Sequence, residues 1–222
     1  MIAVHKPQGQ LVIPGRGAND GVCLKEECAA AVGAPVFVVH RIDRETSGVV
    51  LFAKDSEAHR LLCGAFEKRL VKKEYWAAVM GHPLPAVGAV TSSLREFGSG
   101  RVAPDPRGKQ SRTEYLTLAR WPGGALLEVC PVTGRRHQIR AHLTEILHPI
   151  LGDPLYGPPP RPVGGAPRLM LHARKISFPH PDGGNSTLVC EPPDDFFSYL
   201  NVVSKSQIVY LDDSAVRRNQ II

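Results

Sequence analysis

The sequence has no long apolar run, and its cysteines follow no spaced pattern. Arg, Lys, Pro or Gly interrupts each hydrophobic stretch before it could span a membrane, and residues 1–4 are too short for the apolar region of a signal peptide. Five cysteines, an odd number without a CxxC pair, indicate neither a disulfide framework nor a zinc ribbon, so we expect buried reduced thiols. We therefore expect a cytoplasmic protein, with an organellar location after loss of a transit peptide as the alternative.

The motifs of several enzyme classes are also missing. The sequence contains no GxSxG for a serine hydrolase, no P-loop and no HExxH. His137 and His142 stand five positions apart, whereas two helical imidazoles that share a metal are usually four apart. Clustered carboxylates that would favour a metal-dependent nuclease do not occur around the polar motifs described below. The sequence favours chemistry that needs neither a metal nor a cofactor.

Composition and charge are those of a globular protein with an excess of positive charge. The 222 residues are 43% hydrophobic and 22% charged, which predicts one large domain. We expect this domain to cover 1–200, because the sequence changes in character after Leu200. The net charge of +6 favours an anionic partner, nucleic acid first, although on charge alone simple solubility is an equal alternative. Residues 201–222 differ in style from what precedes them, and we expect either an added strand or a floppy tail of unknown role.

The order of apolar runs predicts an α+β fold with a largely antiparallel or mixed sheet. Helices are expected over 21–32, over 56–69 with Ser56 as N-cap, and over 135–147. The stretch 98–112 is rich in Gly, Pro and cations and is expected to be a mobile basic loop. Strands are expected over 35–39, 48–53, 74–79, 113–118 and 125–129.

A dense polar segment, HRIDRETSG at 40–48, separates two of these strands. Loops of this kind hold functional groups on rigid supports. Asp43 is flanked by Arg41 and Arg44, whose positive charge favours the carboxylate form. A surface salt-bridge loop explains the same residues equally well on physical grounds. The residues Thr46 to Gly48 fit a tight turn.

A second polar segment, TGRRHQIRAHL at 133–143, opens the third expected helix. On that helix Ile139 and Leu143 would share an apolar face, while Arg136 and Arg140 would lie one turn apart. Arg140 could then face a cleft. The alternative is an amphipathic helix whose cationic face is simply solvated.

The stretch HRIDRETSGVVLFAKD, from His40 to Asp55, resembles the catalytic signature of the RluA-type pseudouridine synthases. The resemblance continues in order through HKPQG at 5–9, KEY at 73–75, GRRHQIRAHL, HPILGDPLYG and LHA at 171–173. It implies the α+β pseudouridine synthase catalytic fold, in which helices and loops flank the sheet around a central basic cleft. The chain is similar to compact members that lack a small N-terminal S4-like RNA-binding module.

The resemblance also implies the chemistry. Asp43 would be the nucleophile that attacks the ribosyl unit or the uracil ring of a uridine in RNA. Arg140 would pair with Asp43 and keep it charged. Tyr75 would stack on the target base and could take part in proton transfer. No metal or other cofactor is implied.

The remaining roles implied by the resemblance concern RNA binding. Arg41 would fill the space left by a flipped base, and Ile139 would form an apolar wall of the pocket. The partner would be tRNA or rRNA, bound by a monomer. A catalytically silent RNA-binding or RNA-folding protein is the rival, although Asp43, Tyr75 and Arg140 together argue against it. Candidates for RNA contacts are Arg44, Lys6, Lys73, Arg136 and the stretch 101–112.

Overall fold

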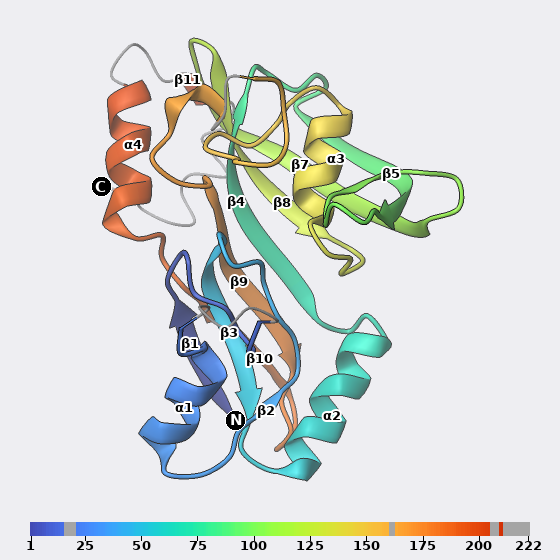
Figure 1. The fold of residues 1–222 in the computed structure, drawn as a ribbon, viewed down its shortest axis with the longest axis vertical. Helices are drawn as coiled ribbons and strands as arrows, with labels where there is room; N and C mark the ends of the chain where they lie inside the picture. The colour runs from blue at the N-terminus through green and yellow to red at the C-terminus, as the bar shows by residue number, and fades with distance from the viewer. Residues whose placement is uncertain (16–20, 160–162, 205–208, 211–222) are drawn as a thin grey trace. The chain divides into compact units, whose positions relative to one another are not determined.

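A computed structural model describes residues 1–15, 21–159, 163–204 and 209–210, and the chain divides into two compact units. Unit 1 comprises Met1–Glu74 and His172–Pro192, and unit 2 comprises Tyr75–Leu171 and Pro193–Ile222. Strands pair mainly in antiparallel fashion, with four α-helices in the described chain (Figure 1). The fold is α+β with a mixed sheet, as the sequence predicts.

The sheet of unit 1 is built around β3 (Ser47–Ala53). β1 (Ile2–Lys6) and β2 (Phe37–Val38) pair antiparallel with β3. β9 (Leu171–Pro179), whose first residue belongs to unit 2, runs parallel to β3, and β10 (Asn185–Val189) continues the sheet beyond β9. All seven residues of β3 are buried, so this strand forms the centre of unit 1.

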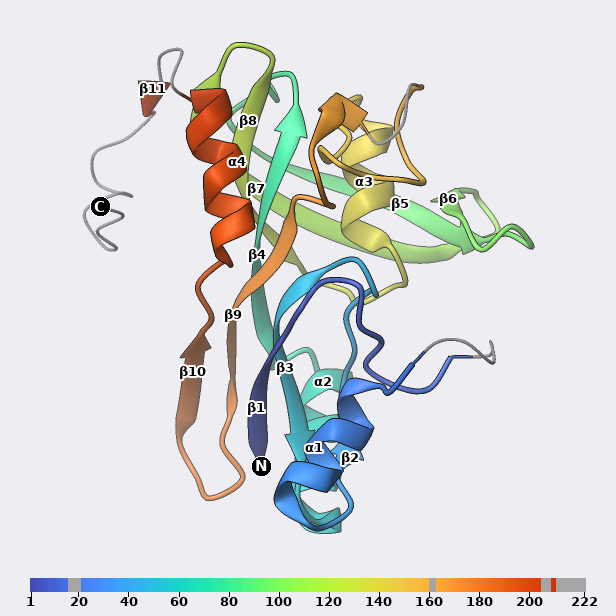
Figure 2. The same ribbon diagram turned by 60° about the vertical axis from the view of Figure 1, so that its left-hand side comes forward.

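Two helices bury the opposite faces of β3. Val49, Leu51 and Ala53 pack against α2 (Ser56–Glu67), whereas Val50 and Phe52 pack against α1 (Leu24–Val32). Alternation along the strand sends successive side chains to opposite faces, which explains why the apolar run is continuous. Figure 1 shows the two helices on either side of β3, and in Figure 2 α1 lies in front of α2.

The N-termini of the helices differ from the prediction. α2 does begin at Ser56, but its N-cap is Asp55, whose Oδ1 accepts a hydrogen bond from the Ala58 amide at 2.8 Å. The expectation that Ser56 is the cap is therefore wrong, because the residue before it satisfies the free amide. α1 begins at Leu24 rather than at 21, and its C-cap is Gly33, which adopts the left-handed conformation that glycine tolerates best.

The sheet of unit 2 is antiparallel, with the strand order β4-β8-β7-β5-β6. β11 (Val209–Tyr210) pairs with β7 on the stretch Ala119–Arg120. The first three residues of β4 belong to unit 1. The strands are β4 (Lys72–Met80), β5 (Val87–Glu96), β6 (Val102–Pro104), β7 (Lys109–Trp121) and β8 (Gly124–Pro131).

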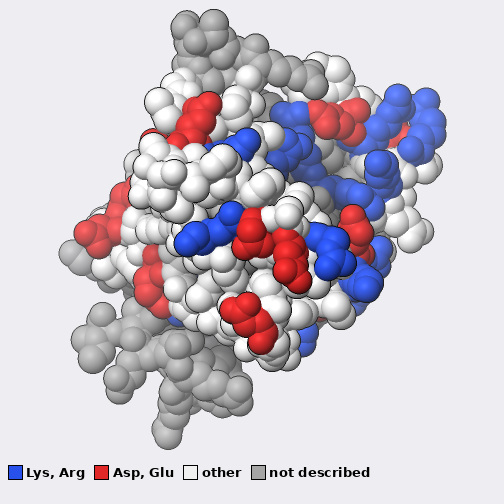
Figure 3. Space-filling view, turned by 90° about the horizontal axis from the view of Figure 1, so that it is seen from below, with Lys and Arg blue, Asp and Glu red and all other residues white. Residues whose placement is uncertain are grey.

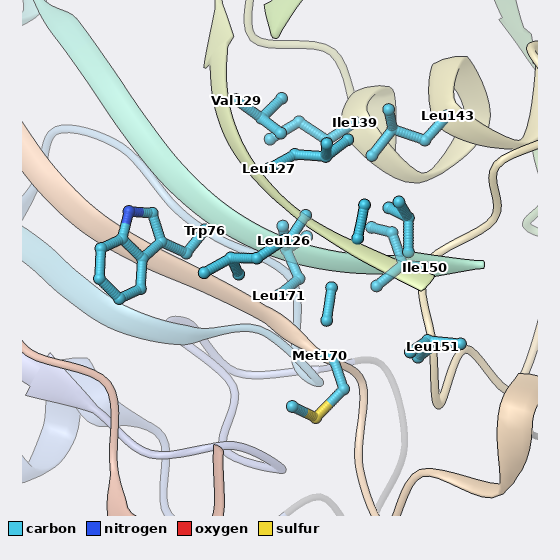
Figure 4. Close-up of a cluster of buried hydrophobic side chains, with 14 of the residues drawn as sticks. Trp76, Leu126, Leu127, Val129, Ile139, Leu143, Ile150, Leu151, Met170 and Leu171 are labelled. Carbon is cyan, nitrogen blue, oxygen red and sulfur yellow. The ribbon is translucent and has the colours of Figure 1, made fainter. Parts of the chain in front are cut away.

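Two helices complete unit 2, together with a short 3-10 turn (Val163–Gly165). α3 (Gln138–Glu145) contributes Ile139 and Leu143 to the buried core, and α4 (Asp194–Ser204) contributes Phe196. In Figure 4 Ile139 points from α3 toward Leu127 and Val129 of β8. The domain boundary expected after Leu200 falls inside α4, while residues 205–208 and 211–222 of the expected tail lie outside the described residues.

The stretch 98–112, which we expected to be a mobile basic loop, contains two strand segments. Residues 102–104 form β6, which pairs with β5, and the residues from Lys109 onward already belong to β7. This stretch has few alternating apolar residues, and its strands form because their backbone pairs with β5. The cations of this stretch are therefore presented by a β-hairpin.

Candidate active site

Asp43 opens a tight turn between β2 and β3. The Thr46 amide donates to the Asp43 carbonyl oxygen at 3.1 Å, so the turn spans Asp43–Thr46 rather than Thr46–Gly48 as we expected. The Asp43 side chain is half-buried. β3 begins directly after the turn, and this buried strand is the rigid support that the sequence predicts for the acidic residue.

Position 48, shortly after the turn, requires a glycine. Its φ is +122°, and a Cβ at this position would lie 2.3 Å from the Ala173 carbonyl oxygen of β9. Gly48 and Ala173 are partners in the parallel pairing of the two strands. A side chain here would separate β9 from the strand that supports Asp43.

Lys6 holds the turn from inside the protein. Its side chain is fully buried, and Nζ donates to the carbonyl oxygens of Pro7 and Gln10, both at 2.8 Å, and of Arg44, at 2.9 Å. We expected Lys6 to contact RNA, which requires an exposed ammonium group. The buried position instead indicates that Lys6 fixes the carbonyl oxygen next to Asp43.

Further hydrogen bonds join the segment 6–10 to the same turn. The Gly9 amide donates to the Arg44 carbonyl oxygen at 2.9 Å, and Arg44 Nε donates to the Gly9 carbonyl oxygen at 2.9 Å. Gln8 Nε2 donates to Glu45 Oε2 at 3.1 Å. Half of the Arg44 side chain is exposed, and Arg44 Nε also lies 4.0 Å from Glu45 Oε1. The two earliest motifs of the sequence thus form one structural element.

A buried serine and histidine pair fixes the start of β3. Ser47 Oγ and His172 Nδ1 are 2.8 Å apart, and His172 Nε2 lies 2.8 Å from the Cys190 carbonyl oxygen. Because a carbonyl oxygen only accepts, Nε2 carries a proton, and in the neutral ring Nδ1 then accepts from the Ser47 hydroxyl. This arrangement gives the LHA motif a supporting role for the strand after Asp43.

His40 and Lys73 are two partly buried basic groups of unit 1, and Arg41, which follows His40, is exposed. His40 Nε2 accepts from the Leu51 amide at 2.9 Å, which requires an unprotonated nitrogen. Burial, and secondly the charge of Lys73, lowers the pKa of His40 to about 3. Burial also lowers the pKa of Lys73 to about 8. His40 is therefore neutral at physiological pH.

Tyr75 and Arg140 lie in unit 2. Tyr75, on β4 opposite Val129, is partly exposed and packs at the margin of the core. Arg140 is buried on α3, where Nε and Nη2 donate to the two carboxylate oxygens of Asp153 at 2.8 and 2.9 Å. The family resemblance implies Asp43 as the partner of Arg140. Asp153 is a partner that no sequence motif indicated.

α3 is shorter than predicted, because a turn held by Gln138 precedes it. Gln138 Oε1 accepts from Thr133 Oγ1 at 2.6 Å and from the Arg135 amide at 3.0 Å, while Nε2 donates to the Arg112 carbonyl oxygen at 2.9 Å. Arg136 consequently lies before the helix and forms an exposed ion pair with Glu96. The expectation that Arg136 and Arg140 are stacked on one helix is wrong.

Within the described ranges, no group of three or more His, Cys, Asp and Glu side chains is arranged to hold a metal ion. Cys23 and Cys28 are buried thiols, and the other three cysteines are partly exposed. Among the described helices, none combines the length and the apolar character needed to cross a membrane.

Comparison with known proteins connects these motifs to one family. Residues 1–145 match the family described as RNA pseudouridylate synthase. The tRNA pseudouridine synthase C of Pasteurella multocida is 35% identical over 87% of this chain and 88% of its own length. The dual-specificity RNA pseudouridine synthase RluA of Salmonella typhi is 36% identical over 87% of this chain and 90% of its own.

Two further relatives extend the comparison. The ribosomal large subunit pseudouridine synthase D of Nitrosomonas europaea is 35% identical over 91% of this chain, which spans 62% of that protein. The solved structure of human RNA pseudouridylate synthase domain containing 4 superposes with a TM-score of 0.76 at 26% identity. The superposition covers 95% of this chain and 91% of the human chain.

Proposed function

The chain belongs to the RNA pseudouridylate synthase family, and from this we propose that it converts uridine to pseudouridine in RNA. The observation that carries the proposal is the Asp43 turn. Asp43 stands at the first position of a tight turn, and Lys6 donates a hydrogen bond to the carbonyl oxygen of the next residue, Arg44. A buried scaffold of this kind holds a nucleophile in one orientation.

We propose that Asp43 forms a transient covalent bond with the ribosyl unit or the uracil ring of the target uridine. The bond between the ribose carbon and the ring nitrogen breaks, the uracil turns, and a carbon–carbon bond forms in its place. In a ribosyl adduct the carbon–oxygen bond to Asp43 breaks as the carbon–carbon bond forms, and in a uracil adduct it breaks afterwards, so Asp43 leaves as a carboxylate in both cases. The ring carbon loses its proton, and the ring nitrogen released from ribose gains one. Substrate and product are isomers, so the reaction needs no external oxidant or reductant.

Arg140 and Tyr75 are assigned supporting roles in this proposal. Arg140 supplies the cation that keeps the nucleophile charged, and Tyr75 supplies a ring for stacking and a phenol for proton transfer. Arg41 is exposed, as insertion into an RNA stem in place of the flipped base requires. Ile139 packs inside the core of unit 2, and we propose that it supports the pocket wall.

The substrate class follows from the relatives and from charge. The names of the similar proteins refer to tRNA and to ribosomal RNA, and we propose one of these as the substrate. The net charge of +6 favours a polyanionic ligand, and Figure 3 shows basic side chains gathered toward one side of the viewed face. These relatives are enzymes by name, which supports turnover over the silent RNA-binding alternative.

The test uses unmodified total RNA and three proteins: wild type, Asp43→Asn and the control Asp182→Asn. Asp182 is a strongly exposed carboxylate of unit 1. Pseudouridine is mapped by chemical derivatisation and sequencing, with a chelator present. We expect site-specific signal from wild type and Asp182→Asn only. Signal from Asp43→Asn would refute the nucleophile, and no signal from wild type on either RNA class would refute the function.

A further inference from the structure

Two side chains of the segment HPILGDPLYG, Asp153 and Tyr156, enclose Arg140 within unit 2. We infer that both are positioning residues for Arg140, and that Tyr156 links Arg140 to the β5–β6 hairpin. The inference rests on the proposed function, in which Arg140 serves the reaction. None of the roles assigned above uses either residue.

Asp153 fixes the plane of the Arg140 guanidinium. The two side chains are 0% and 4% exposed, respectively, and two parallel hydrogen bonds join them. Asp153 Oδ1 also accepts from the backbone amides of Leu155, at 2.8 Å, and Tyr156, at 2.9 Å. The carboxylate is thus held by its own loop and transmits that orientation to the guanidinium.

The loop that presents Asp153 has little freedom. Gly152 has a φ of +72°, and a Cβ on it would lie 1.6 Å from the Arg168 carbonyl oxygen. The backbone before Asp153 is therefore packed against its neighbour as closely as glycine allows. A loop with a fixed conformation can hold the Asp153 carboxylate, and through it the Arg140 guanidinium, in one orientation.

Tyr156 supports the guanidinium from another side. Its buried ring lies 4.9 Å from Arg140 Cζ, within the range of a cation–π contact. The phenol oxygen accepts from the Val102 amide at 2.8 Å and lies 3.0 Å from His137 Nδ1. Val102 begins β6, and His137 directly precedes α3. The hydroxyl therefore connects the hairpin with the helix that carries Arg140.

The guanidinium of Arg101 also contacts the Tyr156 ring. Arg101, in the hairpin turn, has its Cζ 5.3 Å from the ring centroid of Tyr156. An RNA phosphate that draws Arg101 toward itself would change the contacts of Tyr156 and hence of Arg140. RNA binding at the hairpin should therefore act on the rate of the reaction as well as on affinity. Nearby cations are Arg95 on β5, Arg107 in the turn after β6, and Lys109 and Arg112 on β7, which also pairs with β5.

The first test is Tyr156→Phe, which keeps the ring and removes both hydroxyl contacts. We expect the single-turnover rate of pseudouridine formation to fall roughly 10-fold, while the RNA Kd stays within about 2-fold, since only the orientation of Arg140 is loosened. Asp153→Asn should lower the rate further. The matched control is Asp195→Asn, which removes the partner of another buried arginine, Arg168, at 2.7 Å. It should lower the melting temperature without changing the rate.

A rescue experiment separates positioning from general stability. Guanidinium ion added to Arg140→Ala should restore part of the rate, because Asp153 and Tyr156 still form its site. The double variant Arg140→Ala/Asp153→Asn should not respond. Wild-type rates in both Tyr156→Phe and Asp153→Asn, or a change in Kd alone, would overturn the inference. If Asp153→Asn does not fold, the rate and Kd of Tyr156→Phe alone test the inference. An inactive wild type would instead defeat the proposed function.

Discussion

Lys6 shows how one buried charge can set the shape of a functional turn. Its ammonium group has three backbone carbonyl oxygens as acceptors, and a methionine of similar length offers them no donor. We expect Lys6→Met to lower the free energy of unfolding by about 2–5 kcal/mol, since several buried carbonyl oxygens lose their partner. Urea unfolding measures the effect. The exposed Lys54→Met is the control, and equal stability of the two variants would contradict the role of Lys6.

Because His142 is buried, we expect the protein to become less stable as the pH falls. His142 is fully buried, Nδ1 lies 2.8 Å from Thr113 Oγ1, and burial lowers its pKa from 6.5 to about 4. The unfolded chain therefore binds the proton first as the pH falls below 6.5. This contribution to stability is complete above pH 6.5 and is lost as the pH falls through about 4. His40, with a pKa lowered to about 3, acts in the same direction.

The measurement is urea unfolding between pH 7 and pH 4. The slope from His142 can reach about 1.4 kcal/mol per pH unit, because one proton is taken up on unfolding. His142→Asn, which keeps a polar atom near Thr113, should flatten this slope. His180→Asn, at a partly exposed histidine, should leave it nearly unchanged. Identical slopes in wild type and His142→Asn would show that His142 does not titrate as proposed.

At the scale of elements, Gly48 controls the pairing of β3 with β9. A methyl group there would meet the Ala173 backbone, and the φ of +122° is unfavourable for any side chain. We expect Gly48→Ala to destabilise the protein by about 3 kcal/mol or more, from strain plus the clash. The control is Gly64→Ala on α2, where nothing lies within 4 Å of the new Cβ. That variant should gain about 0.5–1 kcal/mol from helix propensity, and thermal unfolding of both tests the contrast.

The elements that the sequence predicts well are those whose apolar pattern is continuous. The run GVVLFA of β3 and the periodic residues of α2 mark these elements because burial and local propensity agree. β9 was not predicted, because Arg174 and Lys175 interrupt its apolar pattern. The structure shows that both pair with Glu74, so the strand is stabilised by ion pairs that the sequence does not reveal.

The residues of the candidate site likewise divide into those that a local sequence pattern reveals and those that it does not. The motifs around Asp43 and Arg140 indicate polar groups on rigid supports, and local patterns suffice to find them. Asp153 and Lys6 act through contacts with distant residues, 13 and 38 positions away, respectively. Gln138 likewise ends the turn before α3 through a bond to Arg112 of β7. A single sequence does not specify such partners, because they depend on how the elements pack.

For the whole molecule, the net charge of +6 predicts RNA binding that weakens steeply with salt. The inactive Asp43→Asn is suited to this measurement, since bound RNA is not converted. Affinity is measured by fluorescence anisotropy over a salt series. If several phosphates are contacted, log Kd should rise with log salt by about 0.7–0.9 for each contact. A flat response would refute a basic RNA-binding surface.

Two double variants in the Asp43→Asn background can separate total charge from local contact, because each removes two positive charges. Lys109→Gln/Arg112→Gln removes exposed cations at the start of β7, whereas Lys25→Gln/Lys54→Gln removes cations from unit 1 outside the proposed RNA contacts. If the start of β7 binds phosphate, only the first pair should lower the salt slope, by roughly one to two. Equal reductions would mean that long-range attraction by net charge is sufficient. The start of β7 would then have no specific part in holding the RNA near Arg101.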